Sequence, residues 1–95
     1  MTKADVVNDV AKHTGVEKVA VQKTIECFME VVIESLAKDR NVYFRGFGSF
    51  IVKKRAAKTA RNISQNVAIH IPEHYIPAFK PAKTFNAKVK LGVKK

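Results

Sequence analysis

The sequence has few of the features that mark secreted, membrane-spanning or large proteins. It has a single cysteine in 95 residues, so no disulfide can form within the chain. No apolar run approaches the roughly 20 residues that a membrane-spanning helix needs. The N-terminal segment carries Asp5 and Asp9 and no long hydrophobic stretch, so we expect no secretory signal peptide. Chains of this length form one domain, which we place over residues 1–95.

Acidic residues are almost absent from the second half of the chain. Residues 1–44 hold six Lys and Arg against seven Asp and Glu, whereas residues 45–95 hold twelve against Glu73 alone. The whole chain has a net charge of +10 and a pI of about 10.0. This asymmetry predicts a near-neutral scaffold joined to a cationic half that binds a polyanion.

The residues needed for catalysis or metal binding are also scarce. The spacing typical of metal ligands is absent among His13, His70, His74 and Cys27. Catalysis by a pair of carboxylates would need two acids, and the basic half has only one. We therefore expect no catalytic residue, no metal site and no cofactor, and the chain is not predicted to be an enzyme. Cys27 has no basic neighbour in sequence that would activate a thiol, so we interpret it as a small core residue.

Helical periodicity dominates the first forty residues. Thr2 and Asp5 have the spacing of a capping box, which opens a helix near Lys3 that should end at residues 13–15. A longer helix is predicted over residues 18–38. Its polar residues form one narrow stripe, and its apolar arc is wider than a surface helix needs. We expect the extra apolar face to pack against a second subunit in a dimer.

After residue 41 the period changes to two, which is typical of strands. Residues 42–45 and 49–55 should form a hairpin around the turn Gly46-Phe47-Gly48, which lacks the Lys-Ser/Thr of a phosphate-binding loop. Alternation places aromatic side chains on one face of the hairpin and basic side chains on the other.

The remainder of the basic half should extend that hairpin and close the fold. Residues 56–61 and 67–71 should pair as a second ribbon. Pro72 and Pro77 then bracket an edge segment, after which Phe79 returns to the core. The C-terminal helix is predicted over residues 83–90, with Phe85 and Val89 as its buried pair.

Several motifs in the basic half resemble the HU/integration host factor family of bacterial histone-like DNA-bending proteins. They are residues 45–50 (RGFGSF), 55–57 (RAA), 61–62 (RN), 69–72 (IHIP) and 77–83 (PAFKPAK). The resemblance covers essentially the whole chain. It implies an α+β fold with two N-terminal helices, a three-stranded antiparallel sheet with a long β-ribbon arm, a short C-terminal helix and an intertwined dimer.

The resemblance also implies a division of the domain. Residues 1–40 would form the helical dimerisation base, residues 41–81 the sheet with a DNA-embracing arm at about 54–74, and residues 82–95 the C-terminal helix and tail. The residues that we expect in the dimer core are apolar: Phe28, Met29, Val32, Leu36, Phe44, Phe47, Phe50 and Phe79.

The predicted DNA-binding residues are mostly cations, with small residues at the turn and polar residues and one isoleucine at the arm tip. They are Lys3, Gly46, Ser49, Lys53, Arg55, Lys58, Arg61, Asn62, Ile63, Gln65, Lys80 and Lys83. The cations would neutralise phosphates, and Arg61 and Asn62 would reach minor-groove base edges. Ile63 stands where the family has a proline that wedges between base steps. It is interpreted as a wedge, with simple packing on the arm as the alternative. Ala82 stands at a position where the family usually has glycine.

The predicted function is a histone-like architectural protein that binds duplex DNA largely without sequence specificity and bends or compacts it through minor-groove arms. Two alternatives stay open: a site-preferring subunit like integration host factor, and a module that binds structured RNA. The expected partners are double-stranded DNA and a second copy of the chain, with a heterodimer as an open variant and no membrane. The expected location is the cytoplasm, in association with the nucleoid.

Overall fold

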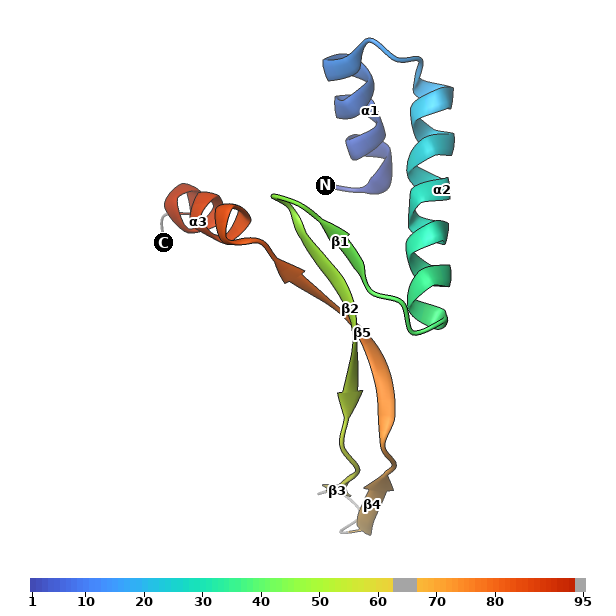
Figure 1. Cartoon of the computed structure of the whole chain (residues 1–95), viewed down its shortest axis with the longest axis vertical. Helices are drawn as coiled ribbons and strands as arrows, with labels where there is room; N and C mark the ends of the chain where they lie inside the picture. The colour runs from blue at the N-terminus through green and yellow to red at the C-terminus, as the bar shows by residue number, and fades with distance from the viewer. Residues whose placement is uncertain (63–66, 94–95) are drawn as a thin grey trace. The chain divides into compact units, whose positions relative to one another are not determined.

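The computed structural model describes residues 1–62 and 67–93 (Figure 1). They fall into two compact units, which are divided between Ser35 and Leu36. The first unit contains helix α1 (Lys3–Thr14) and most of α2 (Lys18–Ala37). The second contains strands β1 (Val42–Phe44), β2 (Gly48–Arg55), β3 (Lys58–Asn62), β4 (Val67–Ile71) and β5 (His74–Pro81), and helix α3 (Lys83–Gly92). The predicted α+β fold is confirmed.

The ends of the first helix agree with the sequence prediction. The Thr2 hydroxyl accepts a hydrogen bond from the Asp5 backbone N–H, and the Asp5 carboxylate accepts one from the Thr2 backbone N–H at 2.9 Å. This reciprocal capping box satisfies two N–H groups that the helix itself leaves without partners. At the other end, the Gly15 N–H donates to the Ala11 carbonyl at 2.9 Å. Helix α2 ends one residue before the predicted Lys38.

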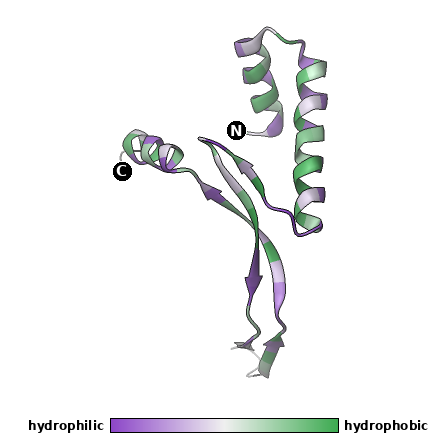
Figure 2. Cartoon of the chain, in the orientation of Figure 1, coloured by the Kyte–Doolittle hydropathy of each residue, from purple (hydrophilic) through white to green (hydrophobic). Residues whose placement is uncertain are grey.

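Much of the α2 ribbon has the colour of hydrophobic residues (Figure 2). Few apolar side chains are buried within one chain. Among the described residues, only Val7, Val21 and Val32 are buried hydrophobic side chains. The prediction that Cys27 is a core residue is wrong for the single chain, because Cys27 is exposed beside Phe28 and Val31. No described helix has the length and hydropathy to span a bilayer.

The sheet of the second unit has the strand order β1-β2-β5 and is antiparallel throughout. The turn between β1 and β2 is closed by a hydrogen bond from the Phe47 N–H to the Phe44 carbonyl at 3.0 Å. Gly46, the third residue of this turn, has a φ of 80°, a value that residues other than glycine rarely adopt. A Cβ on Gly48 would lie 2.7 Å from the Lys80 carbonyl oxygen, so only glycine allows β5 to approach so closely.

The ribbon continues from the sheet after a short interruption. All eight residues of β2 pair with β5, from Gly48 opposite Pro81 to Arg55 opposite His74. Strands β3 and β4 then form a separate two-stranded ladder. The predicted pairing is confirmed, with β4 at the predicted residues 67–71 and β3 at 58–62 instead of the predicted 56–61. Pro72 lies in the gap between the two ladders and has no N–H to donate, which helps to explain the break.

Five phenylalanine rings pack together where the sheet meets α3. Phe79 lies at the centre, with ring centroids 4.9 Å from Phe50, 5.4 Å from Phe47 and 5.7 Å from Phe85. Phe44 packs edge-to-face on Phe50 at 6.1 Å. This cluster confirms that the aromatic face of the hairpin builds a core, although Phe79 is still 38% exposed in the single chain.

The C-terminal helix differs from the prediction at one of its two core positions. Phe85 packs on Phe47 with ring centroids 5.3 Å apart, as a core residue should. Val89 was predicted as the second member of the buried pair, and this is wrong for the single chain, where Val89 is 50% exposed. Val89 lies one turn beyond Phe85, and the described residues of its own chain cover only about half of its surface.

Candidate nucleic-acid interface

The register of β2 and β5 gathers three of the predicted phosphate-binding cations on one face of the sheet. Directly opposed residues of an antiparallel pair share a face, and alternate residues along a strand share it too. Ser49, Lys53 and Arg55 therefore lie on the same face as Lys80, which is opposite Ser49. We call this the basic face of the sheet. Lys53, Arg55 and Lys80 are exposed on it.

The opposite face of the same strands carries the aromatic cluster. Phe50 is opposite Phe79, and Val52 is opposite Pro77. A strand with apolar residues on one side and cations on the other can bury only the first, so burial of the aromatic face directs the basic face toward solvent. The structure thus has the two-sided arrangement that alternation in the sequence predicts, except that the half-buried Ile51 and Ile76 share the basic face.

An open groove of about 680 Å³ lies at the end of the basic face. Gly46, Ser49, Lys80 and Lys83, all predicted to bind DNA, are among its lining residues. Its walls come from the β1–β2 turn, the end of β5 and the start of α3, and two hydrogen bonds join them. The Ala82 N–H donates to the Phe47 carbonyl at 2.9 Å. The Thr84 hydroxyl donates to the Gly46 carbonyl at 3.1 Å.

Two further residues in this groove were not among the predicted site residues. Arg45 is exposed at the turn and adds a guanidinium, the side chain best suited to bind phosphate with two parallel hydrogen bonds. Tyr43 is 70% exposed and lies opposite Ser49, so it belongs to the basic face. In the sequence, both residues alternate with the apolar Val42 and Phe44. This pattern could have identified them as residues of the basic face.

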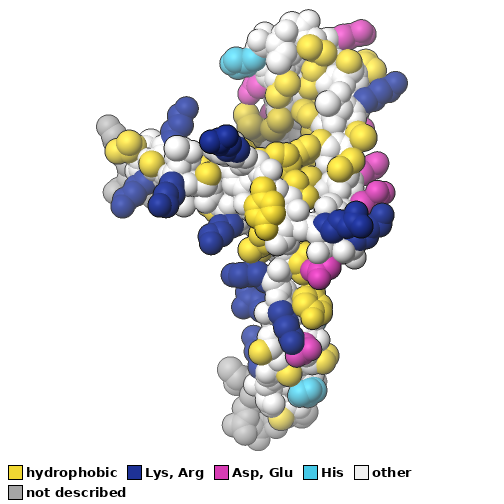
Figure 3. All heavy atoms as spheres, in the orientation of Figure 1, with side chains coloured by type: hydrophobic (Ala, Val, Ile, Leu, Met, Phe, Trp, Pro, Cys, Tyr) yellow, Lys and Arg dark blue, Asp and Glu magenta, His cyan; other side chains and the backbone are white. Residues whose placement is uncertain are grey.

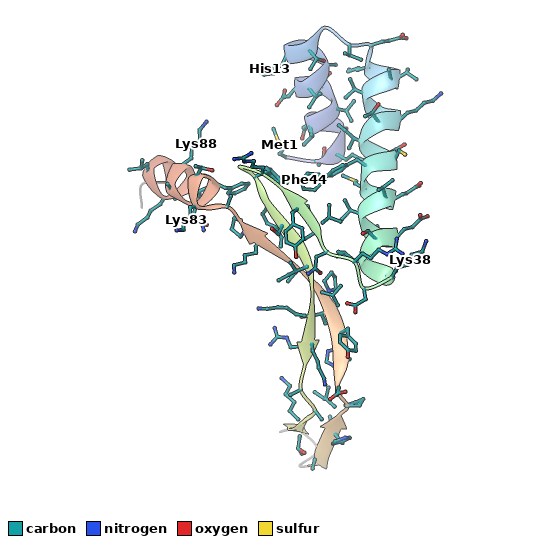
Figure 4. All side chains as sticks on the ribbon, in the orientation of Figure 1. Met1, His13, Lys38, Phe44, Lys83 and Lys88 are labelled. Carbon is teal, nitrogen blue, oxygen red and sulfur yellow. The ribbon has the colours of Figure 1, made fainter. Side chains whose placement is uncertain are left out.

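The groove also contains the N-terminus of α3. Lys83 is the first residue of this helix, and the N-cap residue Ala82 makes no side-chain capping bond. Helix N-termini attract anions because their backbone N–H groups point outward. Ala82 has φ −68° and ψ 160°, an extended conformation open to any residue, so alanine is tolerated where the family usually has glycine. Lys83 and Lys88 project from different sides of α3 (Figure 4).

The ribbon carries the remaining predicted arm residues. Lys58 is exposed at the start of β3. The backbones of Arg61 and Asn62 pair with Ala68 and Val67 near the tip of the ladder. The predicted wedge Ile63 and the predicted contact residue Gln65 lie outside the described residues.

Lys3 belongs to the helical unit and already has an anionic partner. Its ammonium donates to Glu26 Oε2 at 2.7 Å, which links α1 to α2. This hydrogen bond, with a weaker one from Gln22 and the charge of Lys3, holds the pKa of the Glu26 carboxyl below its usual value. Both side chains stay accessible, with 49% of Lys3 and 40% of Glu26 exposed. Lys3 would have to exchange this carboxylate for a phosphate.

Charge is segregated on the surface. Dark-blue lysine and arginine side chains follow the β2–β5 strands and surround α3, whereas magenta acidic side chains concentrate on the helical unit (Figure 3). Within the described parts of the basic half, Glu73 is the sole acid, and its carboxylate is 3.2 Å from the Lys54 ammonium. In residues 1–62 and 67–93, no cluster of His, Cys, Asp and Glu could hold a metal ion.

A three-stranded sheet with one basic face, continued by a two-stranded ribbon, defines a small basic protein of the β-ribbon nucleic-acid-binding class. Residues 1–90 match the family model described as bacterial DNA-binding protein, and the chain belongs to that family. It is 41% identical over 90 residues to DNA-binding protein HU from Thermotoga maritima, which covers 95% of this chain and all of that protein.

Two further similarities bear on function. The chain is 35% identical over 96 residues to integration host factor subunit beta from Marinobacter nauticus, which covers all of this chain and 98% of that protein. The HU chain in a cocrystal structure of Anabaena HU with DNA superposes with a TM-score of 0.89 at 34% identity, over 94% of this chain and 97% of that one.

Proposed function

We propose that this protein binds duplex DNA largely without sequence specificity and bends it, as an architectural protein associated with the nucleoid. The observation that carries the proposal is the basic face, where Lys53, Arg55 and Lys80 line one side of a sheet that continues into a ribbon. The Anabaena HU–DNA complex supports it, because a chain of the same fold was crystallised with DNA.

Phosphate neutralisation would supply most of the affinity. Each lysine or arginine that meets a phosphate releases condensed counterions, which gives binding energy without sequence information. The groove at the end of the sheet adds Arg45, Lys83 and the outward N–H groups of α3. These groups would hold the DNA backbone beside the ribbon.

The ribbon would act as an arm in the minor groove. Base edges there distinguish little beyond A·T from G·C, so Arg61 and Asn62 would give weak sequence preference. Ile63 would insert between base steps and kink the duplex, because apolar wedges are a common device of minor-groove bending proteins.

A dimer would place two such arms on one duplex. The single chain leaves Phe28 44%, Met29 45% and Phe47 47% exposed, and a monomer with so small a core is marginal. These residues belong to the predicted dimer core, so a second copy would cover them. The Marinobacter similarity favours one second candidate, a site-preferring subunit like integration host factor, whose specificity would come from DNA deformability.

Duplex binding across a salt series tests the proposal directly. We expect the affinity for a 30-base-pair duplex to fall steeply with salt, and the two labelled ends to approach each other by fluorescence transfer. Arg55→Ala should weaken binding to every duplex and flatten the salt slope by about one unit for each lost phosphate contact. Lys12→Ala, which removes an exposed cation of α1, should leave the slope unchanged.

The other outcomes separate the alternatives. No binding to duplex DNA with strong binding to duplex RNA of equal length would overturn the proposal in favour of an RNA module. A preference of 1000-fold or more for one sequence over random duplex would support the site-preferring subunit instead. Binding without approach of the ends would retain DNA binding and remove bending.

A further inference from the structure

His74 lies on the basic face of the sheet but is not among the predicted DNA-binding residues. It opens β5 and lies directly opposite Arg55, the last residue of β2. Opposed residues of an antiparallel pair have Cβ atoms about 5 Å apart on the same face. Lys53 is two residues along β2 from Arg55 and therefore shares this face. His74 is exposed there.

A hydrogen bond fixes how the imidazole of His74 presents its two nitrogens. Nδ1 lies 3.0 Å from the Pro72 carbonyl oxygen, which can only accept. Nδ1 therefore carries a hydrogen, and in the neutral ring Nε2 is left as an acceptor that repels phosphate oxygens. Protonation adds an N–H at Nε2 without disturbing the bond to Pro72. The ring is therefore held by the same bond in both charge states, and only its charge changes.

The charged groups around His74 favour a polyanion as its partner. Arg55 faces it across the ladder, Lys53 lies on the same face, and Lys58 begins the next strand of the ribbon. The adjacent acid, Glu73, has its carboxylate 3.2 Å from the ammonium of Lys54. The described strands thus offer His74 cationic neighbours on its own face, where a DNA phosphate would meet several positive groups together.

We propose that His74 is a phosphate ligand that operates only when protonated, so that DNA affinity rises as the pH falls from about 8 to 5.5. Histidine is the side chain whose charge ordinarily changes in this range. One additional phosphate contact steepens the salt slope by about 0.9, which amounts to about eight-fold tighter binding per chain at 0.1 M salt. By linkage, bound DNA must in turn help His74 to retain its proton. This inference rests on the proposed DNA binding.

The test measures the affinity of the full chain for a 30-base-pair duplex at pH 5.5, 6.5 and 8.0, each over a salt series. The wild-type protein should bind about eight-fold tighter at pH 5.5 than at pH 8.0 for each chain engaged, with a slope steeper by about 0.9. His74→Gln should retain the pH 8.0 affinity and lose this gain. His13→Gln changes an exposed histidine of α1, bonded to the Asp9 carbonyl at 2.7 Å, and should behave as wild type.

A second measurement records the protonation of the His74 imidazole directly by NMR. The NMR titration of the His74 imidazole should move to higher pH when DNA is added, whereas that of His13 should not. A stability defect in His74→Gln cannot imitate this shift, because it is measured on the unaltered protein. His70 lies opposite Thr59 on the ribbon, and His70→Gln should keep the pH response.

The results separate this inference from the function on which it rests. A full pH response in His74→Gln, or its loss in His70→Gln alone, would overturn the role of His74. Tight binding that is indifferent to pH would also overturn it while leaving the proposed function intact. Absence of duplex binding at every pH would overturn the proposed function itself.

Discussion

The substitution Phe47→Ala measures whether a second chain covers the aromatic cluster. Within one chain, Phe47 packs on Phe85 at 5.3 Å, on Phe79 at 5.4 Å and on Phe44 at 6.4 Å. It is nevertheless 47% exposed. Truncating a fully buried phenylalanine to alanine costs about 3–5 kcal/mol of folding free energy.

Because Phe47 is about half exposed in one chain, the loss of folding free energy in Phe47→Ala should differ between a monomer and a dimer. If the single chain is the folded unit, about half of the ring is buried and Phe47→Ala should cost about 2 kcal/mol. If a partner chain covers the rest, the cost should reach about 4 kcal/mol. We expect the larger value, and the difference of about 2 kcal/mol corresponds to roughly 30-fold in the unfolding equilibrium.

Urea unfolding at several protein concentrations provides the assay. For a folded dimer, the wild-type midpoint should rise with protein concentration, because association stabilises only the folded state. Tyr75→Ala is the matched control. Tyr75 is 65% exposed, lies opposite Lys54 and should cost less than about 1 kcal/mol. A loss near 2 kcal/mol in Phe47→Ala, together with a midpoint independent of concentration, would refute the covered-interface argument.

Three further predictions concern the arm, the helical unit and the sheet. Ile63→Ala should reduce the approach of duplex ends by fluorescence transfer while changing affinity less than about three-fold; equal bending would rule out a wedge. Because hydrogen bonding to Lys3 lowers the pKa of Glu26, the pair stabilises the fold above the ordinary value of 4.5 and loses this effect as pH falls through the lowered pKa. Glu26→Gln should therefore lower the thermal midpoint more at pH 7 than at pH 3, and an equal difference at both would contradict the assignment. Gly48→Ala should cost about 2–3 kcal/mol in urea unfolding, because its Cβ would lie 2.7 Å from a backbone oxygen of β5, and a neutral effect would show that β5 can shift.

Local signals were sufficient to predict the elements. The capping box at Thr2 and Asp5, the helical period over residues 18–38 and the two-residue period from residue 42 each depend on neighbours a few positions apart. The order and type of the elements, including the two-ladder ribbon, followed from these patterns. The boundaries differed by one or two residues, as at the end of α2, because helix ends are fixed by small differences in hydrogen bonding.

Burial was less predictable than secondary structure. Cys27 was assigned to the core because no basic neighbour in sequence would activate its thiol, and Val89 because it is an apolar residue one helical turn from Phe85. Both are exposed in one chain. A periodic pattern identifies which face of a helix is apolar, and it does not say whether the same chain or another one covers it. For Ala82, the family pattern suggested a glycine requirement that the extended backbone does not impose.

The sequence by itself determined the fold class, the segregation of positive charge into the second half and the motifs that mark the family, because all three are properties of composition and short-range order. Only the tertiary structure decided the strand register. Register depends on long-range pairing, and it places His74 opposite Arg55, Ser49 opposite Lys80 and Gly48 against the backbone of β5. The tertiary structure also showed the hydrogen bond between Lys3 and Glu26. These residues are 23 positions apart in the sequence, and no local pattern encodes their contact. The chemistry of the basic face therefore originates in the sequence, and its geometry arises from how β2 and β5 pair.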